Sequence, residues 1–81
     1  NAEINVLAYD RPALLVDITN VLSDSKVPLK AMNARTTKDN VAIMNLTLEI
    51  TDTEQLEKII KTIRKVRGVF EVERSKQQVR V

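Results

Sequence analysis

The sequence predicts an α+β fold of the ferredoxin-like type, a βαββαβ sandwich in which a four-stranded antiparallel sheet carries two helices on one face. Three observations support this expectation. Apolar residues follow strand and helix periodicity in the order strand, helix, strand, strand, helix, strand. Turn-forming residues stand at the junctions between these segments. The length of 81 residues suits one domain and is too short for two.

The first strand is expected over residues 2–9, where apolar and polar side chains alternate. A helix from about Pro12 to about Ser25 follows, with Pro12 at its first position, where a missing N–H costs no hydrogen bond. Asp10 precedes the helix and favours its positive end. The predicted apolar stripe of this helix consists of Leu14, Leu15, Ile18, Val21 and Leu22.

A second strand is expected to begin near Pro28, because the residue before a proline disfavours helix. Leu29 and Met32 are three residues apart, which breaks the alternation and predicts a bulge or bend near Ala31. Asp39 and Asn40 tolerate positive φ, so they predict a tight hairpin turn into the third strand.

The third strand shows the clearest alternation, with core-facing Ala42, Met44, Leu46, Leu48 and Ile50. With Ile4, Val6 and Ala8 of the first strand, these residues mark the two central strands. A second helix is predicted to start near Asp52, which forms a capping box with Gln55. Its apolar stripe consists of Leu56, Ile59, Ile60, Ile63 and Val66. Gly68 is expected as the left-handed C-cap.

The last strand is expected over residues 69–74, and residues 75–81 either extend it or form a tail. Residues 1–81 are therefore expected to form a single domain. Since the sequence does not begin with Met, we expect this domain to be a piece of a larger multidomain chain.

The sequence offers few candidate residues for catalysis. The chain has no cysteine and no histidine, which excludes a disulfide, a thiolate metal site and the usual proton shuttle. A single glycine leaves no glycine-rich phosphate loop. Asp17 and Asp24 are expected as solvated acids on the first helix. We therefore predict no catalytic residue, no metal site and no cofactor, and a free-standing enzyme is the least favoured hypothesis.

Two further classes of function are also disfavoured. Only Tyr9 and Phe70 are aromatic, so the base-stacking strands of an RNA-recognition motif are not expected. No apolar run approaches the roughly 20 residues that span a bilayer, and no signal-peptide pattern opens the chain. We expect no membrane contact and a cytoplasmic location.

Charge is distributed unevenly along the chain. Residues 1–53 carry five Lys or Arg against seven Asp or Glu, a balance of −2. Residues 54–81 carry eight against four, a balance of +4. The basic half is a candidate surface for a partner. The alternative is an ordinary solvated helix face, on which Glu54 and Glu57 are spaced to pair with Lys58 and Lys61.

The stretch from Asp10 to Thr19, which reads DRPALLVDIT, resembles the opening of ACT domains. These regulatory modules usually read D-R-x-G-L-L, followed by an acidic and an apolar residue. The element order and the step at residues 26–29 into the second strand also match, so the resemblance covers the chain. Residues 44–50 and 66–74 resemble the C-terminal ACT domain of RelA/SpoT-type (p)ppGpp synthetases and hydrolases.

The resemblance to RelA/SpoT-type enzymes implies a regulatory domain of a stringent-response GTP pyrophosphokinase, without catalysis of its own. Such domains relay the state of the ribosome or another partner to the catalytic part, and some contact ribosomal RNA. We expect docking of this kind, with a homodimer or another domain of the same chain as further partner. The candidate contact residues are Lys58, Lys61, Arg64 and Lys65.

The wider ACT family implies an alternative, the sensing of an amino acid. Many ACT domains pair side by side and bind an amino acid at the turn from first strand to first helix, with help from the second strand. The corresponding candidates here are Asp10, Arg11, Pro12, Ala13, Leu14 and Pro28.

Two of these six positions depart from the family pattern. Ala13 replaces a glycine that lets the ligand approach the backbone. Pro28 replaces a frequent asparagine and offers neither a side-chain amide nor a backbone N–H. Docking is therefore the favoured hypothesis, and amino-acid sensing is the alternative.

Overall fold

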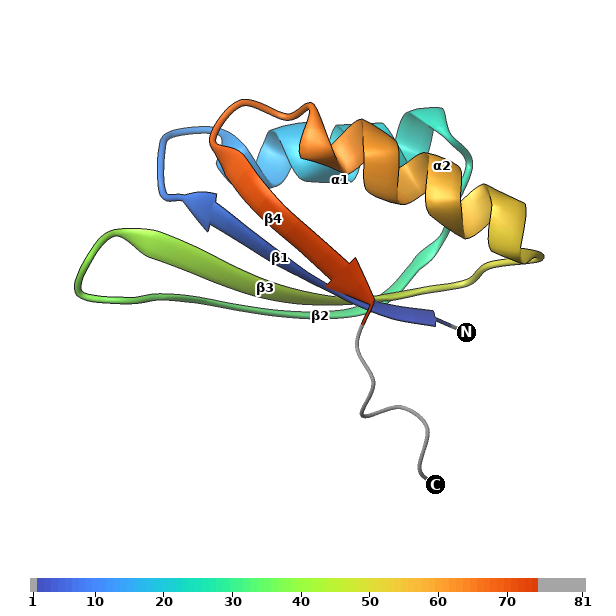
Figure 1. Ribbon diagram of the computed structural model, residues 1–81, viewed down its shortest axis with the longest axis horizontal. Helices are drawn as coiled ribbons and strands as arrows, with labels where there is room; N and C mark the ends of the chain where they lie inside the picture. The colour runs from blue at the N-terminus through green and yellow to red at the C-terminus, as the bar shows by residue number, and fades with distance from the viewer. Residues whose placement is uncertain (1, 75–81) are drawn as a thin grey trace, which may run out of the picture.

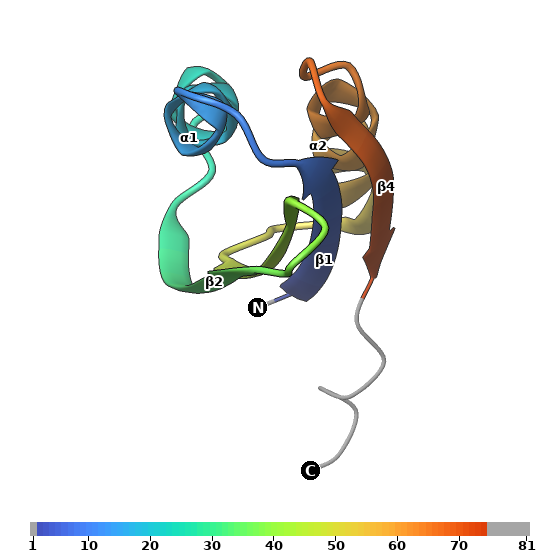
Figure 2. The same cartoon turned by 90° about the vertical axis from the view of Figure 1, so that its left-hand side faces the viewer.

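The computed structural model describes residues 2–74 and contains six elements in the predicted order. They are β1 (Ala2–Tyr9), α1 (Leu14–Asp24), β2 (Leu29–Thr36), β3 (Val41–Leu48), α2 (Thr53–Arg64) and β4 (Val69–Arg74). The antiparallel sheet has the order β2-β3-β1-β4, and both helices lie on one of its faces (Figures 1 and 2). The ferredoxin-like fold is thereby confirmed. The expectation for residues 75–81 lies outside the described residues.

The hydrophobic core fills the space between the sheet and the helices. Side chains along β1 and β3 alternate between buried and partly exposed, as a half-buried strand requires. The predicted core residues of the two central strands are at most 2% exposed, apart from Ala42 at 6%; they are Ile4, Val6, Ala8, Met44, Leu46 and Leu48. Ile50 lies beyond the end of β3 and packs against the core. Burying each large side chain contributes roughly 1.5–3 kcal/mol.

The start of α1 differs from the prediction. Pro12 is not the first helical residue, because it stands in a turn in which the Leu14 N–H donates to the Arg11 carbonyl at 3.3 Å. Ala13 precedes the helix with a φ of 66°, and no side chain caps this end. An L-residue in this left-handed conformation is strained by about 1–2 kcal/mol. The prediction of Pro12 at the helix start is therefore wrong by two residues.

The start of α2 agrees with the prediction. Asp52 Oδ1 accepts a hydrogen bond from the Gln55 N–H at 2.7 Å, which satisfies one free donor of the first turn. The Gln55 side chain returns to the Thr51 N–H at 2.8 Å, one residue before the position used in a standard capping box.

Gly68 is not the C-cap of α2, contrary to the prediction. The helix ends at Arg64, and the residue after it keeps a right-handed conformation. Gly68 lies three residues further, in the turn into β4, with a φ of 94°. A Cβ at this glycine would lie 3.3 Å from the Tyr9 carbonyl oxygen, so the close passage of two chain segments also favours glycine.

The edge strand β2 is less covered than the rest of the sheet. Its pairing with β3 shifts between Leu29 and Ala31, which confirms the predicted bulge. Asn40 in the following turn has a φ of 62°, which confirms the predicted hairpin. Every residue of β2 after Leu29 is exposed, on both faces of the sheet. Neither helix therefore closes over this strand.

The sheet face opposite the helices is called the open face below. Along the central strands it presents Glu3, Asn5, Leu7 and Tyr9 from β1, and Val41, Ile43, Asn45 and Thr47 from β3. Asn45 Nδ2 donates to Asn5 Oδ1 at 2.6 Å across the two strands. The open face is thus part apolar and part polar, without the rows of aromatic residues that stack on RNA bases.

Replacing Ala13 with glycine is expected to raise the free energy of unfolding by about 0.5–1 kcal/mol, because glycine adopts a positive φ without strain. Urea denaturation of the 81-residue chain measures this change. Ala34→Gly on β2 is the matched control and is expected to lower the stability, since no left-handed conformation is needed there. Equal destabilisation by both substitutions would contradict the role of strain at Ala13.

Candidate functional site

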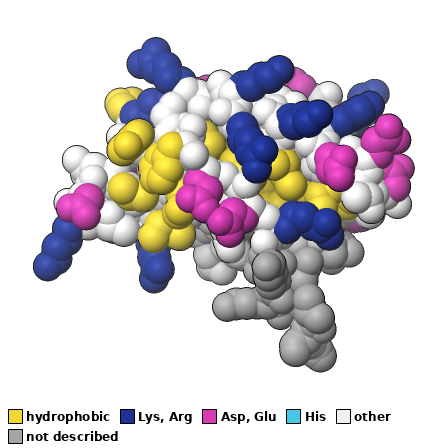
Figure 3. All heavy atoms as spheres, in the orientation of Figure 1, with side chains coloured by type: hydrophobic (Ala, Val, Ile, Leu, Met, Phe, Trp, Pro, Cys, Tyr) yellow, Lys and Arg dark blue, Asp and Glu magenta, His cyan; other side chains and the backbone are white. Residues whose placement is uncertain are grey.

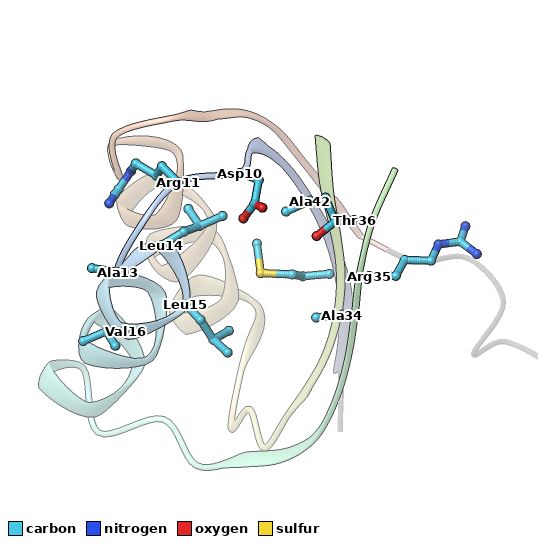
Figure 4. Close-up of a pocket in the computed structure, with 11 residues that line it drawn as sticks. Asp10, Arg11, Ala13, Leu14, Leu15, Val16, Ala34, Arg35, Thr36 and Ala42 are labelled. Atoms are coloured by element: carbon cyan, nitrogen blue, oxygen red, sulfur yellow. The ribbon is translucent and has the colours of Figure 1, made fainter. Parts of the chain in front are cut away.

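A groove of about 310 Å³ opens between the start of α1 and the helix-side face of β2 and β3 (Figure 4). It exists because α1 leaves β2 uncovered. Its walls come from the β1–α1 turn and first helical turn (Asp10, Arg11, Ala13, Leu14, Leu15 and Val16), from β2 (Ala34, Arg35 and Thr36) and from β3 (Ala42 and Met44).

Four of the six predicted ligand residues line this groove, namely Asp10, Arg11, Ala13 and Leu14. Pro12 and Pro28 lie outside its lining. Pro28 precedes the opposite end of β2, where its carbonyl accepts a hydrogen bond from the Glu49 N–H at 3.0 Å. The structure therefore brings the turn residues together and separates them from Pro28.

Asp10 is the ionisable side chain that points into the groove, between α1 and the sheet (Figure 4). Its backbone N–H donates to the Asn40 carbonyl at 2.8 Å, which fixes the turn against the β2–β3 hairpin. Within residues 2–74 its carboxylate has no ion-pair partner. It is therefore available to accept charge-assisted hydrogen bonds from a cationic group.

Arg11 contributes to the groove wall, but its guanidinium points away (Figure 4). Nε donates to the Arg67 carbonyl at 2.8 Å, and Nη1 donates to the Pro12 carbonyl at 2.9 Å. Nη2 forms an ion pair of 2.7 Å with Asp17, whose side chain remains 45% exposed, as predicted for a solvated acid. These bonds tie the β1–α1 turn to α1 and to the α2–β4 turn, and they occupy the donors that a ligand would need.

The groove is partly apolar. Leu15, which the periodicity placed in the buried stripe of α1, is 40% exposed and lies between the helix and the sheet (Figure 4). Val16 and Met32 are also exposed large hydrophobic residues of α1 and β2. An apolar surface beside a free carboxylate suits a ligand that carries both an ammonium and a hydrocarbon group.

The four predicted partner-binding residues on and just after α2 are all exposed; they are Lys58, Lys61, Arg64 and Lys65. Figure 3 shows basic side chains gathered over this helix. Arg64 Nη2 donates to the Val72 carbonyl at 3.1 Å, which holds its side chain against β4.

The predicted ion pairs within α2 do not form, so Glu54 and Glu57 leave the lysines of this surface unpaired within residues 2–74. Three cationic side chains therefore face solvent without an internal partner, and they are Lys58, Lys61 and Lys65. A surface of this kind attracts a polyanion.

Two other kinds of site can be assessed for the described part of the chain. Within residues 2–74 no group of three or more acidic side chains is placed to hold a metal ion. No helix in the same range is long and apolar enough to cross a bilayer.

Comparison with known proteins identifies the relatives of this chain. A sequence profile described as "ACT domain" matches residues 1–74. A GTP pyrophosphokinase of Myxococcus xanthus is 41% identical over 71 residues, which cover 88% of this chain and 9% of that protein. The bifunctional (p)ppGpp synthase/hydrolase RelA of Mycobacterium tuberculosis is 39% identical over 71 residues, with 88% and 10% covered. This chain thus spans about a tenth of the length of these relatives.

A solved structure shows the same arrangement of elements. The crystal structure of the ACT domain from the GTP pyrophosphokinase of Chlorobium tepidum superimposes with a TM-score of 0.80 at 30% identity. The match covers 91% of this chain and 95% of that one, so the solved relative consists of little more than this domain.

Arg11→Lys is expected to lower the free energy of unfolding by about 1–2 kcal/mol, because lysine cannot reproduce the three directed bonds of the guanidinium. Arg74→Lys, at an exposed position on β4, is the matched control and is expected to change the stability by less than about 0.5 kcal/mol. Urea denaturation of both variants measures the difference, and equal stabilities would show that the Arg11 bonds are not needed.

Proposed function

This chain belongs to the ACT domain family, and we propose that it is the non-catalytic regulatory domain of a stringent-response GTP pyrophosphokinase, a (p)ppGpp synthetase/hydrolase. In this proposal the domain relays the state of the ribosome or another partner to the catalytic part. It does so through RNA or protein contacts and through self-association. The similarity to these enzymes covers 88% of this chain but only 9–10% of the length of the enzymes. This small share supports the proposal that the domain is a regulatory part of such an enzyme and does not catalyse its reaction.

The observation that carries the proposal is the exposed basic surface of α2. Lys58, Lys61 and Lys65 have no internal partner within residues 2–74, so binding a polyanion breaks no existing ion pair. Phosphate groups bound by lysines release counterions, which makes such binding favourable at low salt.

Replacing Lys58, Lys61 and Lys65 together with glutamate is expected to weaken binding to deproteinised ribosomal RNA by at least tenfold, because three phosphate contacts are lost. Fluorescence anisotropy at several salt concentrations measures the affinity. The logarithm of the binding constant should fall with a slope of about −2 to −3 against the logarithm of salt for the unchanged chain.

The matched control reverses Lys26, Lys30 and Lys38, which lie outside α2 and change the net charge equally. This variant is expected to retain more affinity than the α2 variant. Equal losses in both variants, or no RNA binding by the unchanged chain, would contradict docking through α2.

The second candidate function is the sensing of an amino acid, and the groove beside α1 favours it. Asp10 offers a free carboxylate for the ligand ammonium, and Leu15 offers an apolar wall. No side chain caps the start of α1, where backbone N–H groups attract a carboxylate. The methyl group of Ala13, also in the lining, opposes close approach to the backbone.

Titration of the isotope-labelled chain with each common amino acid separates the two candidates. For the sensor, saturable NMR shifts are expected at residues 10–16, and Asp10→Asn is expected to weaken binding at least tenfold because the ligand ammonium loses its counter-charge. Asp24→Asn on the exposed end of α1 is the matched control, expected to bind as the unchanged chain does. Absence of saturable shifts with all amino acids would exclude the sensor and leave docking unaffected.

A further inference from the structure

The open face carries a row of four side chains whose character changes from one sheet edge to the other. Arg35 on β2 pairs in register with Ile43 on β3, which pairs with Leu7 on β1, which pairs with Glu71 on β4. The side chain of Arg35 points away from the helix side of the sheet (Figure 4). Across the strands, the row therefore reads cation, apolar, apolar, anion.

The neighbouring rows extend this pattern. On one side, Asn33, Asn45 and Asn5 are followed by Glu73, so amides lead to a second acid on β4. On the other side, Val41 pairs with Tyr9.

The Tyr9 ring packs against Phe70 with centroids 4.9 Å apart. Tyr9 is 61% and Phe70 49% exposed. An apolar strip thus follows the central strands, with a cation at one edge and acids at the other.

The charges at the two edges lack opposite partners within the described chain. Among residues 2–74, Arg35 forms no ion pair, and neither Glu71 nor Glu73 pairs with a cation. Glu73 hydrogen-bonds to Glu71 and repels its charge, which raises the pKa of Glu71 above its usual value. A cation placed beside these acids would relieve this repulsion.

We propose that the open face packs against the open face of a second copy of this chain, about a two-fold axis parallel to the central strands. This operation reverses the strand order, so that β2 of one copy lies over β4 of the other and β3 lies over β1. Arg35 then faces Glu71, and Ile43 faces Leu7, in both halves of the interface. A row that changes sign from edge to edge is self-complementary under this rotation, as an isologous contact requires.

The geometry of packed sheets agrees with this arrangement. Two sheets stack about 10 Å apart with strands aligned to within about 30°. In this arrangement the apolar side chains of Leu7 and Ile43 lie at the centre of the contact, and the charged side chains of Arg35 and Glu71 lie at its edges, nearer to solvent.

The size of the open face indicates a weak dimer. Strands about 4.8 Å apart with a rise of about 3.3 Å per residue give four strands of up to eight residues an area of roughly 500 Å². A standard interface buries about 800 Å² on each partner. The inference rests on the self-association included in the proposed function, and it identifies the surface that carries it.

Charge reversal tests the pairing directly in the 81-residue chain. Sedimentation equilibrium up to about 1 mM is expected to show a dimer for the unchanged chain. Arg35→Glu and Glu71→Arg are each expected to weaken it at least tenfold, because like charges then face each other twice. An equimolar mixture of the two variants is expected to restore the dimer, since both opposite-charge contacts form again in the heterodimer.

Lys61→Glu on α2 is the matched control and is expected to dimerise as the unchanged chain does. Circular dichroism confirms that each variant is folded. The open-face contact would be overturned if neither charge reversal weakened the dimer, or if the two variants remained monomeric when mixed. Self-association would then have to use another surface, such as the β2 edge. An unchanged chain that stays monomeric at about 1 mM would overturn self-association itself, while the RNA measurement on α2 remains independent.

Discussion

The pairing of β1 with β3 determines both faces of the sheet at once. Its register runs without interruption from Ala2 opposite Leu48 to Tyr9 opposite Val41. On both strands the even-numbered residues face the helices and the odd-numbered residues face outward. A slip of one residue would exchange the two sets and place asparagine and glutamate in the core. The core, and the ordered row on the open face, therefore depend on the same register.

Arg11 and Ala13 together determine how α1 leaves the sheet. The left-handed conformation of Ala13 redirects the chain after the turn, and the Arg11 guanidinium ties that turn to the α2–β4 turn. In the resulting arrangement α1 does not cover β2, so Leu15 faces a groove. Arg11 belongs to the stretch that resembles a ligand-binding motif, but its role here is structural, because it connects two turns of the fold. Asp10 keeps its side chain free within residues 2–74.

The sequence predicted those elements in which one periodicity dominates, such as β3 and the stripe of α2. The start of α1 was missed because alanine carries no signal for positive φ, and tertiary packing imposes the conformation. The sequence also predicted correctly that four of the six ligand candidates lie together, because these four are close neighbours along one turn of the chain. The relation of Arg35 to Glu71 was not accessible in this way. It depends on the register of three strand pairings, which no single segment reveals.

The outer pairing of β1 with β4 also governs how the domain responds to mechanical load. Ile4 lies opposite Arg74, so the first described residues and the last lie side by side at one end of the sheet (Figure 1). Tension that pulls these ends apart acts across the strands and loads their hydrogen bonds one after another, as in a zipper. Such a geometry opens at low force, in contrast to strands pulled along their length. A partner that strains the two ends of this domain would release β4 first.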